Sequence, residues 1–411
     1  MKNKILKHCR ICFSKQLISY LDLGNQPFSN SFLNSEDIKK EKKFPLNVVL
    51  CKKCGLSQLS IIPNTKFIFS KYDYLSSSSR ALSNHYKDLV DKVLRKYNIS
   101  STNTVLDIGC NDGILLKHYP KKFKQIVGIE PSDASKHIKE KRIKLINKFF
   151  NIKTSKEYLK KYKKPRIITI TNVLAQINNL NDLAASLEKI MDKQSLIIIE
   201  FPYLLHMVDK VLFDVIYHEH LSYFSLTPLK FLFEKFNIKI INFEKINIGA
   251  SGPAIRLFLS KNNSNYKTLN KVNKQIIYEK KWGIKKIKKY KLFKQKVKSK
   301  IAKIKKIINS KYNKNYNIGC FTASSKGNTL LNCLNLDKKI IKFASENNIK
   351  KIGKYTPGSH IKIINDNDFL KKKIDYAILL SWNYKNFFLK KSLFSQKGGK
   401  FIIPLPNPHI K

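Results

Sequence analysis

Arginine and acidic residues are scarce in this chain of 411 residues. Lysine and arginine together number 80 against 28 aspartates and glutamates, which gives a formal net charge of +52, yet only six of the basic residues are arginine. Proteins that read phosphates and bases specifically favour the arginine fork, and the lysines here are spread over every segment. We therefore interpret the charge as a solvated surface that attracts anionic substrates, and we expect no nucleic-acid partner.

Long apolar runs are also missing. The chain holds no stretch of about 18 apolar residues, which a membrane-spanning helix needs. Its first 17 residues are basic but contain no apolar core, which argues against a signal peptide. We expect a cytoplasmic protein without a membrane partner. A hydrophobic fraction of 43% and this length predict two or three domains with buried cores.

Cysteines are few, and four of the seven form two CxxC pairs, Cys9 with Cys12 and Cys51 with Cys54. Each CxxC turn lets two thiolates reach one ion, and two such turns complete a tetrahedron. An odd cysteine count without a signal peptide favours metal binding over a disulfide framework. The alternative is four reduced, buried cysteines. The pattern predicts a structural zinc ion that leaves no open position for water.

The distribution of apolar runs predicts an α/β protein. Four short runs alternate with amphipathic segments, which is typical of parallel βαβ units. They are 104–108, 125–129, 166–170 and 196–200. Residues 284–308 place apolar side chains at helical spacing among lysines, and a second α/β cycle follows. We predict a zinc-binding domain (1–65), a Rossmann-like domain (66–263), a basic helical connector (264–315) and a second Rossmann-like domain (316–411).

A glycine-containing turn follows the first of these strands, in Asp107-Ile-Gly-Cys-Asn-Asp-Gly113. Gly109 and Gly113 allow the backbone to approach a ligand and to turn into a helix. Asp107 at the strand end can accept hydrogen bonds from an ammonium group. The pattern DxGxNxG, with Asn111, differs from the GxGxxG of dinucleotide sites and favours S-adenosylmethionine. A plain turn with a helix-capping acid is the alternative.

Two further strand ends belong to the same expected site. Glu130, followed by Pro131, ends the second strand, where a carboxylate can take both hydroxyls of a ribose. Asn172 ends the third predicted run, beside the expected methionine half of the cofactor. An ordinary polar strand end explains Asn172 almost as well.

The string Ile216-Tyr-His-Glu-His-Leu-Ser-Tyr-Phe224 gathers two of the nine histidines, one glutamate and two tyrosines. Imidazole and carboxylate suit a metal ion, and they also suit general acid–base chemistry. We favour acid–base chemistry because the pair lacks the i, i+4 spacing of metal-binding helices. Satisfied polar residues in a turn are a third interpretation.

With these motifs the chain resembles the sugar C-methyltransferases that act on nucleotide-linked keto-deoxysugars, over nearly its whole length. The matching segments include the cysteine pairs, the loop 21–33, the segment 72–77, the DxGxNxG turn and Tyr217-His-Glu-His220. The C-terminal matches are Lys326-Gly-Asn-Thr-Leu-Leu331, Gly353-Lys-Tyr-Thr-Pro-Gly-Ser-His360 and Ser381-Trp-Asn383.

The resemblance implies that residues 66–263 form a Rossmann-like class I methyltransferase domain. It also implies that a methyl group is transferred to carbon 3 of a 4-keto-6-deoxysugar, in deoxysugar or surface-polysaccharide biosynthesis. His220 is the implied base, and Glu219 and Tyr217 are expected to orient it or to stabilise an enolate. Tyr72 or Tyr74 is expected to face the same cavity. The implied partner is a nucleotide-diphosphate keto-sugar, and we expect a monomer or a homodimer.

The nucleotide is expected between the second and fourth predicted domains. Lys326, at a predicted helix start, is the candidate for the diphosphate, although an ordinary helix start is the alternative. Further substrate-binding candidates are Asn328, His360, Asn383, Gln26 and Asn30.

The sequence departs from the family pattern at Gln176, where histidine is common, and in the segment 250–256. Both departures indicate a different sugar. The alternative functions are an O- or N-methyltransferase and a zinc-ribbon protein that binds or modifies RNA.

Overall fold

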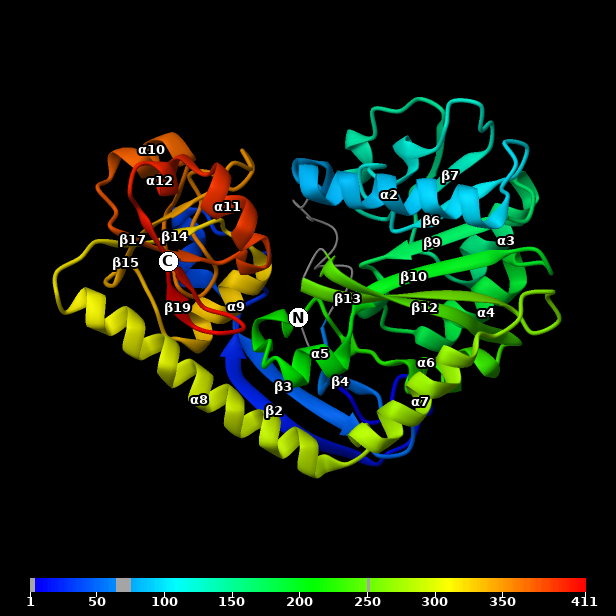
Figure 1. Cartoon of the computed structure of the whole chain (residues 1–411), viewed down its shortest axis with the longest axis horizontal. Helices are drawn as coiled ribbons and strands as arrows, with labels where there is room; N and C mark the ends of the chain where they lie inside the picture. The colour runs from blue at the N-terminus through cyan, green and yellow to red at the C-terminus, as the bar shows by residue number, and fades with distance from the viewer. Residues whose placement is uncertain (1–3, 64–74, 250–251) are drawn as a thin grey trace.

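The computed structural model describes residues 4–63, 75–249 and 252–411, so the expectation for Tyr72 and Tyr74 lies outside the described residues. Figure 1 shows two open sheets on opposite sides of the molecule, with the N-terminal strands and one long helix beneath them. The fold is mixed α/β, as the apolar runs predict.

The first open sheet has seven strands in the order β12-β13-β10-β9-β6-β7-β8. Its first five strands in sequence are parallel, and β13 and β12 add antiparallel pairs at one end. All four predicted strands are confirmed. The strands are β6 (Val105–Ile108), β7 (Ile126–Ile129), β8 (Ile143–Ile146), β9 (Ile167–Thr171), β10 (Leu196–Pro202), β12 (Ile238–Gly249) and β13 (Gly252–Lys261).

Apolar helical faces cover this sheet. In α4 (Leu180–Ile190) the buried residues Leu183, Leu187 and Ile190 follow at spacings of four and three, and Asn179 caps the helix by accepting from the backbone N–H of Asp182 at 3.1 Å. The other helices of this part are α2 (Arg80–Tyr97), α3 (Ile152–Lys161), α5 (Leu204–Asp209) and α6 (Leu226–Glu234), with the 3-10 helices η2 (Ser76–Ser78), η3 (Leu116–His118), η4 (Asp133–His137), η5 (Leu174–Gln176) and η6 (Phe213–Val215).

One local expectation is wrong. The turn at Asp107–Gly113 does not lead into an α-helix, because turns and the short 3-10 helix η3 follow it. Pro120 lies only seven residues after Gly113, and proline disfavours helical backbone before it. Too few residues remain for a stable helix.

The second open sheet has six strands in the order β16-β15-β14-β17-β18-β19, parallel except for the last. This sheet is the second α/β cycle that the sequence predicts after the connector. Its elements are β14 (Ile318–Phe321), α9 (Ser325–Cys333), β15 (Ile341–Ser345), β16 (Ile363–Ile364), α10 (Asp366–Lys371), β17 (Tyr376–Leu379), η7 (Trp382–Tyr384), α11 (Lys385–Lys391), α12 (Leu393–Gln396), β18 (Lys400–Ile403) and β19 (His409–Ile410).

The N-terminal part forms two small antiparallel sheets, and part of the loop expected at 21–33 is strand instead. The larger sheet has the order β11-β4-β3-β2 and takes β11 from beyond the predicted boundary at residue 65. Its strands are β2 (Leu17–Gln26), β3 (Phe44–Cys51), β4 (Ser57–Leu59) and β11 (Ser222–Tyr223); β1 (Lys4–Ile5) pairs with β5 (Ile61–Ile62), and η1 (Ser35–Lys40) lies between β2 and β3.

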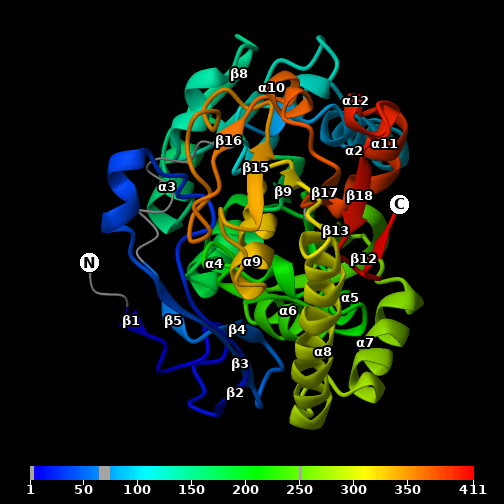
Figure 2. The same cartoon turned by 90° about the vertical axis from the view of Figure 1, so that its left-hand side faces the viewer.

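Two helices, α7 (Asn270–Trp282) and α8 (Ile287–Tyr312), occupy the predicted connector. In α8 the predicted apolar residues Tyr290, Phe293 and Val297 are buried, while the lysines face outward. Tyr290 packs on Tyr20 of β2 with ring centroids 4.7 Å apart. Seen from the side in Figure 2, α8 runs from the level of the N-terminal strands toward the six-stranded sheet. Within the described ranges, no helix is both long and apolar enough to cross a bilayer.

Candidate functional site

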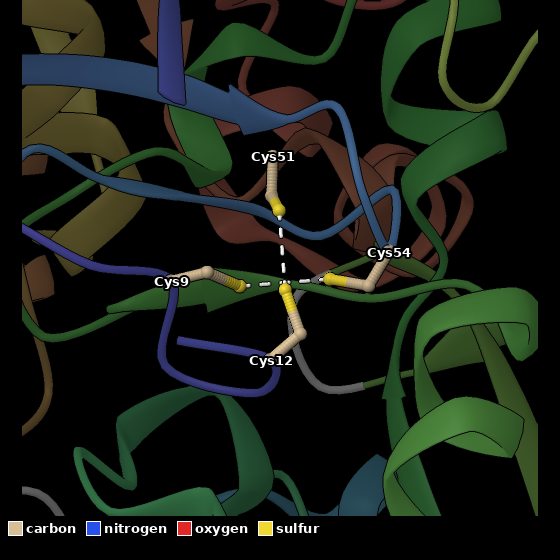
Figure 3. A group of neighbouring side chains, drawn as sticks. All are labelled: Cys9, Cys12, Cys51 and Cys54. Atoms are coloured by element: carbon tan, nitrogen blue, oxygen red, sulfur yellow. Dashed lines mark hydrogen bonds between the residues drawn. The ribbon is translucent and has the colours of Figure 1, made fainter. Parts of the chain in front are cut away.

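The four paired cysteines converge, as Figure 3 shows. Their sulfur atoms all lie within 4.8 Å of one another, and Cys9–Cys54 and Cys12–Cys51 are each 3.5 Å apart. Tetrahedral zinc with Zn–S bonds of about 2.3 Å places sulfurs about 3.8 Å apart. Thiolates this close repel one another unless a cation joins them, and zinc binds cysteine in the thiolate form. The set fits one structural zinc ion.

Both CxxC turns have the same backbone form. The N–H of Phe13 donates to the carbonyl of Cys9 at 3.0 Å, and the N–H of Gly55 donates to the carbonyl of Cys51 at 2.9 Å. Phe13 and Gly55 both have positive φ, 55° and 85°. The chain therefore turns back after each pair and aims both sulfurs toward the same point.

The cofactor candidates lie at one edge of the seven-stranded sheet. Asp107, Glu130 and Asn172 stand at or just after the carboxyl ends of three parallel strands, β6, β7 and β9. The strand order reverses direction between β6 and β9, and open α/β sheets bind ligands at such a point. The expected cofactor residues are therefore brought together.

Gly109 is required by close packing at this turn. A Cβ atom there would lie 2.3 Å from Cγ2 of Val173, and φ is +75°. Gly113 has φ +78°, and its Cβ would lie 2.9 Å from Ile143. Both positions exclude larger residues.

Glu130 ties the second strand end to the turn. Its carboxylate accepts from the N–H of Asn111 at 2.8 Å and from the N–H of Ser132 at 2.9 Å, beyond the half-buried Pro131. Each carboxylate oxygen keeps a second lone pair. Glu130 is thus held in place with capacity for two ribose hydroxyls.

Asp107 and Asn172 complete this edge. Asp107 is buried and accepts from the hydroxyl of Thr169 at 2.6 Å, and burial raises its pKa to about 7. The Asn172 amide donates to the hydroxyl of Tyr86 at 3.2 Å, while its Oδ1 is buried and has no hydrogen-bond partner among the described residues. Both groups have unused capacity for a polar ligand.

The Tyr217–His220 turn is buried beside the small sheet. His220 donates from Nδ1 to the carbonyl of Val215 at 3.0 Å, because a carbonyl can only accept. Its Nε2 therefore carries the lone pair and receives the hydroxyl hydrogen of Tyr217 at 2.8 Å. Burial lowers the pKa of His220 to about 4. The ring is a neutral acceptor at neutral pH.

Glu219 is held by the N-terminal loop. Its Oε1 accepts from both the backbone N–H and the side-chain amide of Asn30, each at 3.0 Å, and Oε2 is buried without a partner in the described chain. Burial raises the pKa of Glu219. His218 turns away, between Phe28 and Phe44, with Nε2 at 3.2 Å from the carbonyl of Pro45.

The metal interpretation of this turn gains no support. In the described parts of the chain, the four cysteines are the one group of three or more ligand side chains close enough to share an ion. Acid–base chemistry and a turn of satisfied polar residues both fit these hydrogen bonds, so the role of the turn stays a prediction.

The expected substrate residues occupy the junction with the six-stranded sheet. Lys326 is buried in the first turn of α9; it donates to the side-chain oxygen of Asn383 and lies 4.1 Å from the ring centroid of Trp382. Asn328 donates to the carbonyl of Ser29 at 2.7 Å and keeps a buried Oδ1 without a partner in the described ranges. Their roles in substrate binding stay predictions.

Gln26 and His360, two other candidates for substrate binding, contact other residues of the protein. Gln26 donates to the carbonyl of Leu23 at 3.0 Å and lies 3.3 Å from Sγ of Cys333. His360 lies 2.9 Å from the carboxylate of Glu41, on the N-terminal part. The contacts of Gln26 with Cys333 and of His360 with Glu41 join the N-terminal part to the six-stranded part.

Sequence reasoning missed two buried polar clusters. Glu200 accepts from His85 at 2.8 Å and from Arg256 at 2.7 Å; burial raises its pKa, but His85 and Arg256 lower it below its usual value. Asp214 accepts from the indole N–H of Trp382 at 2.6 Å. The one available signal was an acidic residue, Asp214, inside an apolar run.

Comparisons with known proteins cover the whole architecture. Family models match at residues 9–69 (zinc binding domain), 79–242 (methyltransferase domain) and 249–406 (C-methyltransferase C-terminal domain). The C-methyltransferase NovU of Streptomyces niveus is 26% identical over 408 residues, which are 98% of this chain and 97% of that protein.

Solved structures resemble part of the chain. An S-adenosylmethionine-dependent methyltransferase from Clostridium acetobutylicum covers 44% of this chain and 92% of its own, with 12% identity and a TM-score of 0.34. Magnesium protoporphyrin IX methyltransferase from Synechocystis, with bound SAH, covers 44% and 83%, with 12% identity and a TM-score of 0.32.

The family matches follow one another along the chain in the order of the zinc cluster, the cofactor edge and the C-terminal sheet. The chain is therefore a zinc-binding, S-adenosylmethionine-dependent methyltransferase that carries the domains of the C-methyltransferases.

Proposed function

We propose that this enzyme methylates carbon 3 of a nucleotide-linked 4-keto-6-deoxysugar through an enolate. The observation that carries the proposal is the buried pair of Tyr217 and His220, in which the imidazole lone pair points at a phenol hydroxyl. An O- or N-methyl transfer needs no group to remove a carbon-bound proton. A protected acid–base pair is what an enolisation requires.

His220 is the base in this proposal, and Tyr217 links it to the substrate. The proton on carbon 3 passes to the phenol oxygen of Tyr217 as the phenol hydrogen passes to Nε2 of His220. The Val215 carbonyl holds the ring in the tautomer that can accept this proton. A positioned base of this kind contributes roughly 10²- to 10⁴-fold.

Glu219 stabilises the enolate. Two N–H donors converge on its Oε1, so its second oxygen, Oε2, is the one left for a ligand. Burial favours the protonated carboxyl, and in that form Oε2 carries a hydrogen that it can donate to the developing oxyanion.

The cofactor edge holds the methyl donor. S-adenosylmethionine, when bound, supplies a methyl group whose thioether leaves without charge, so no acid is needed for that departure. Asp107 accepts from the ammonium group of the ligand, and Glu130 accepts from the ribose hydroxyls. The enolate carbon then forms the new carbon–carbon bond.

Deuterium wash-in tests the proposal. The enzyme is incubated in D₂O with dTDP- and CDP-linked 4-keto-6-deoxysugars and S-adenosylhomocysteine, and NMR follows the proton on carbon 3. We expect exchange with the wild type and with the control His218→Asn, and about 10²- to 10⁴-fold slower exchange with His220→Asn. Methyl transfer from S-adenosylmethionine to these sugars without exchange, or unchanged exchange in His220→Asn, would contradict the proposal.

A further inference from the structure

A buried acid lies at the junction between the seven-stranded and six-stranded parts. Asp214, on η6, is fully buried, and its Oδ2 accepts from the indole N–H of Trp382, on η7, at 2.6 Å. Its Oδ1 is buried without a hydrogen-bond partner in the described ranges. A buried carboxylate is costly unless it is paired, so the hydrogen bond from Trp382 stabilises the contact between η6 and η7.

Lys326 contacts the same indole over the face of its ring. Its ammonium lies 4.1 Å from the ring centroid of Trp382 and donates to Asn383. The electron-rich face of a tryptophan ring attracts a desolvated cation. Trp382 thus contacts a carboxylate through its N–H and an ammonium through its ring.

The acid is next to the group that orients His220. Asp214 directly precedes Val215, whose carbonyl accepts from Nδ1 of His220 at 3.0 Å, and the N–H of His220 donates to the carbonyl of Tyr217 at 2.9 Å. Any shift of Asp214 therefore moves the carbonyl that selects the His220 tautomer.

Ser325, the residue before Lys326 on α9, is linked through Asn30 to Glu219 of the Tyr217–His220 turn. The hydroxyl of Ser325 donates to the side-chain oxygen of Asn30, and Asn30 donates twice to Glu219. Consecutive residues of one helical turn, Ser325 and Lys326, are therefore linked to both ends of the segment 214–220.

We propose that Trp382 and Lys326 are positioning residues, which hold Asp214 and thereby set the orientation of the Tyr217–His220 pair. This inference rests on the proposed acid–base function of that pair. It gives Lys326 a role other than the diphosphate contact expected from the sequence. The six-stranded part then acts on the enolisation step through η6, in addition to any contact with the nucleotide.

The two tryptophans of the chain provide a matched test. Trp382→Phe keeps an aromatic ring for Lys326 and deletes the N–H that binds Asp214. The control Trp282→Phe deletes a similar bond, from Trp282 to the Asp209 carboxylate at 3.0 Å, on the exposed side of α7. Each variant is assayed as the full chain for S-adenosylhomocysteine affinity, KM for the nucleotide sugar, kcat and deuterium wash-in.

We expect Trp382→Phe to slow wash-in and kcat by about 10- to 100-fold, because small misplacements of catalytic groups have effects of this size. The KM for the sugar and the affinity for S-adenosylhomocysteine should stay within about twofold of the wild type, and Trp282→Phe should match the wild type. Wild-type wash-in in Trp382→Phe overturns the inference and leaves the proposed function standing. The absence of deuterium wash-in in the wild type would contradict the proposed function itself.

Lys326→Met separates positioning from diphosphate binding. A positioning residue lowers kcat and leaves KM nearly unchanged, whereas a rise in KM at constant kcat would overturn the inference. Lys326→Met also provides a second route if the tryptophan variant does not fold. It should slow wash-in several-fold, and wild-type wash-in in this variant would overturn the inference.

Discussion

The hydroxyl of Tyr217 lies 2.8 Å from Nε2 of His220, while the opposite ring nitrogen is bound to the carbonyl of Val215 at 3.0 Å. The imidazole is therefore a neutral acceptor with one defined tautomer. Burial keeps it so, since the pKa of His220 falls to about 4. A base in this state is ready across the physiological pH range.

The pH profile of deuterium wash-in should reflect this low pKa. The rate is expected to stay level as pH falls through the ordinary histidine range near 6.5, and to drop only as pH approaches about 4. The pKa of His220 is lower in the folded state than in the unfolded state. Its contribution to the free energy of unfolding is therefore fully present above the unfolded-state pKa and is lost as pH falls through the folded-state pKa. Circular dichroism at each pH separates unfolding from titration. A midpoint near 6.5 in folded protein would contradict the assignment.

Cofactor affinity should rise with pH around neutrality. Burial raises the pKa of Asp107 to about 7, and only the ionised carboxylate pairs with an ammonium group. Calorimetric titration with S-adenosylhomocysteine should therefore show tighter binding at about pH 8 than at about pH 6. Asp107→Asn should bind about 10- to 100-fold more weakly at the higher pH, with a flatter profile. Equal pH dependence in both proteins would rule out this role for Asp107.

Zinc removal should affect the turn at Tyr217–His220 more than the cofactor edge. The cysteine cluster holds β3 and β4, β4 pairs with β11, and the loop after β2 carries Asn30. Cys54→Ser should lower both the zinc content and the melting temperature and abolish wash-in. Cys320→Ala, at a buried cysteine of β14, serves as the control and should keep one zinc per chain. Full zinc content in Cys54→Ser, measured by atomic absorption, would show that the cluster is not the site.

Glu279 should be a strong determinant of stability. It is fully buried on α7 and accepts from Tyr203 at 2.8 Å and from the N–H groups of Leu226 and Thr227, both at 2.8 Å. Hydrogen bonds to a charged group contribute about 1.5–3 kcal/mol. Glu279→Gln, which presents an amide to these donors, should lower the free energy of unfolding in urea by about that amount.

The control for this effect is Glu234→Gln, on the exposed face of α6. In the described parts of the chain, the Glu234 carboxylate pairs with Lys230 across one helical turn, and exposed pairs contribute about 0–1 kcal/mol. Equal losses of unfolding free energy in the two variants would show that the buried hydrogen bonds of Glu279 to the first residues of α6 contribute no more than the exposed ion pair.

The elements that sequence predicted well depend on local patterns. Apolar runs of four or five residues indicated β6, β7, β9 and β10, because buried parallel strands need such runs. The two CxxC pairs indicated the cysteine cluster because each turn is local. The helical spacing of Tyr290, Phe293 and Val297 indicated α8 for the same reason.

The features that sequence missed depend on contacts between distant residues. Trp382 and Asp214 are 168 positions apart, and no local pattern relates them. The tautomer of His220 depends on a backbone carbonyl, and because every residue has one, the sequence does not indicate this contact. The 3-10 helix after Gly113 arises from competition between the turn and Pro120, whereas the glycine pattern alone favoured an α-helix.

The position of the transferred methyl group distinguishes methylation of carbon 3 from O- or N-methylation. The enzyme is supplied with S-adenosylmethionine labelled with ¹³C in the methyl group and with a nucleotide-linked 4-keto-6-deoxysugar, and the product is examined by NMR. Methylation at carbon 3 gives a carbon-bound methyl signal that correlates with that carbon of the sugar, and this is the result we expect. A label that appears as an O-methyl or N-methyl signal would contradict it.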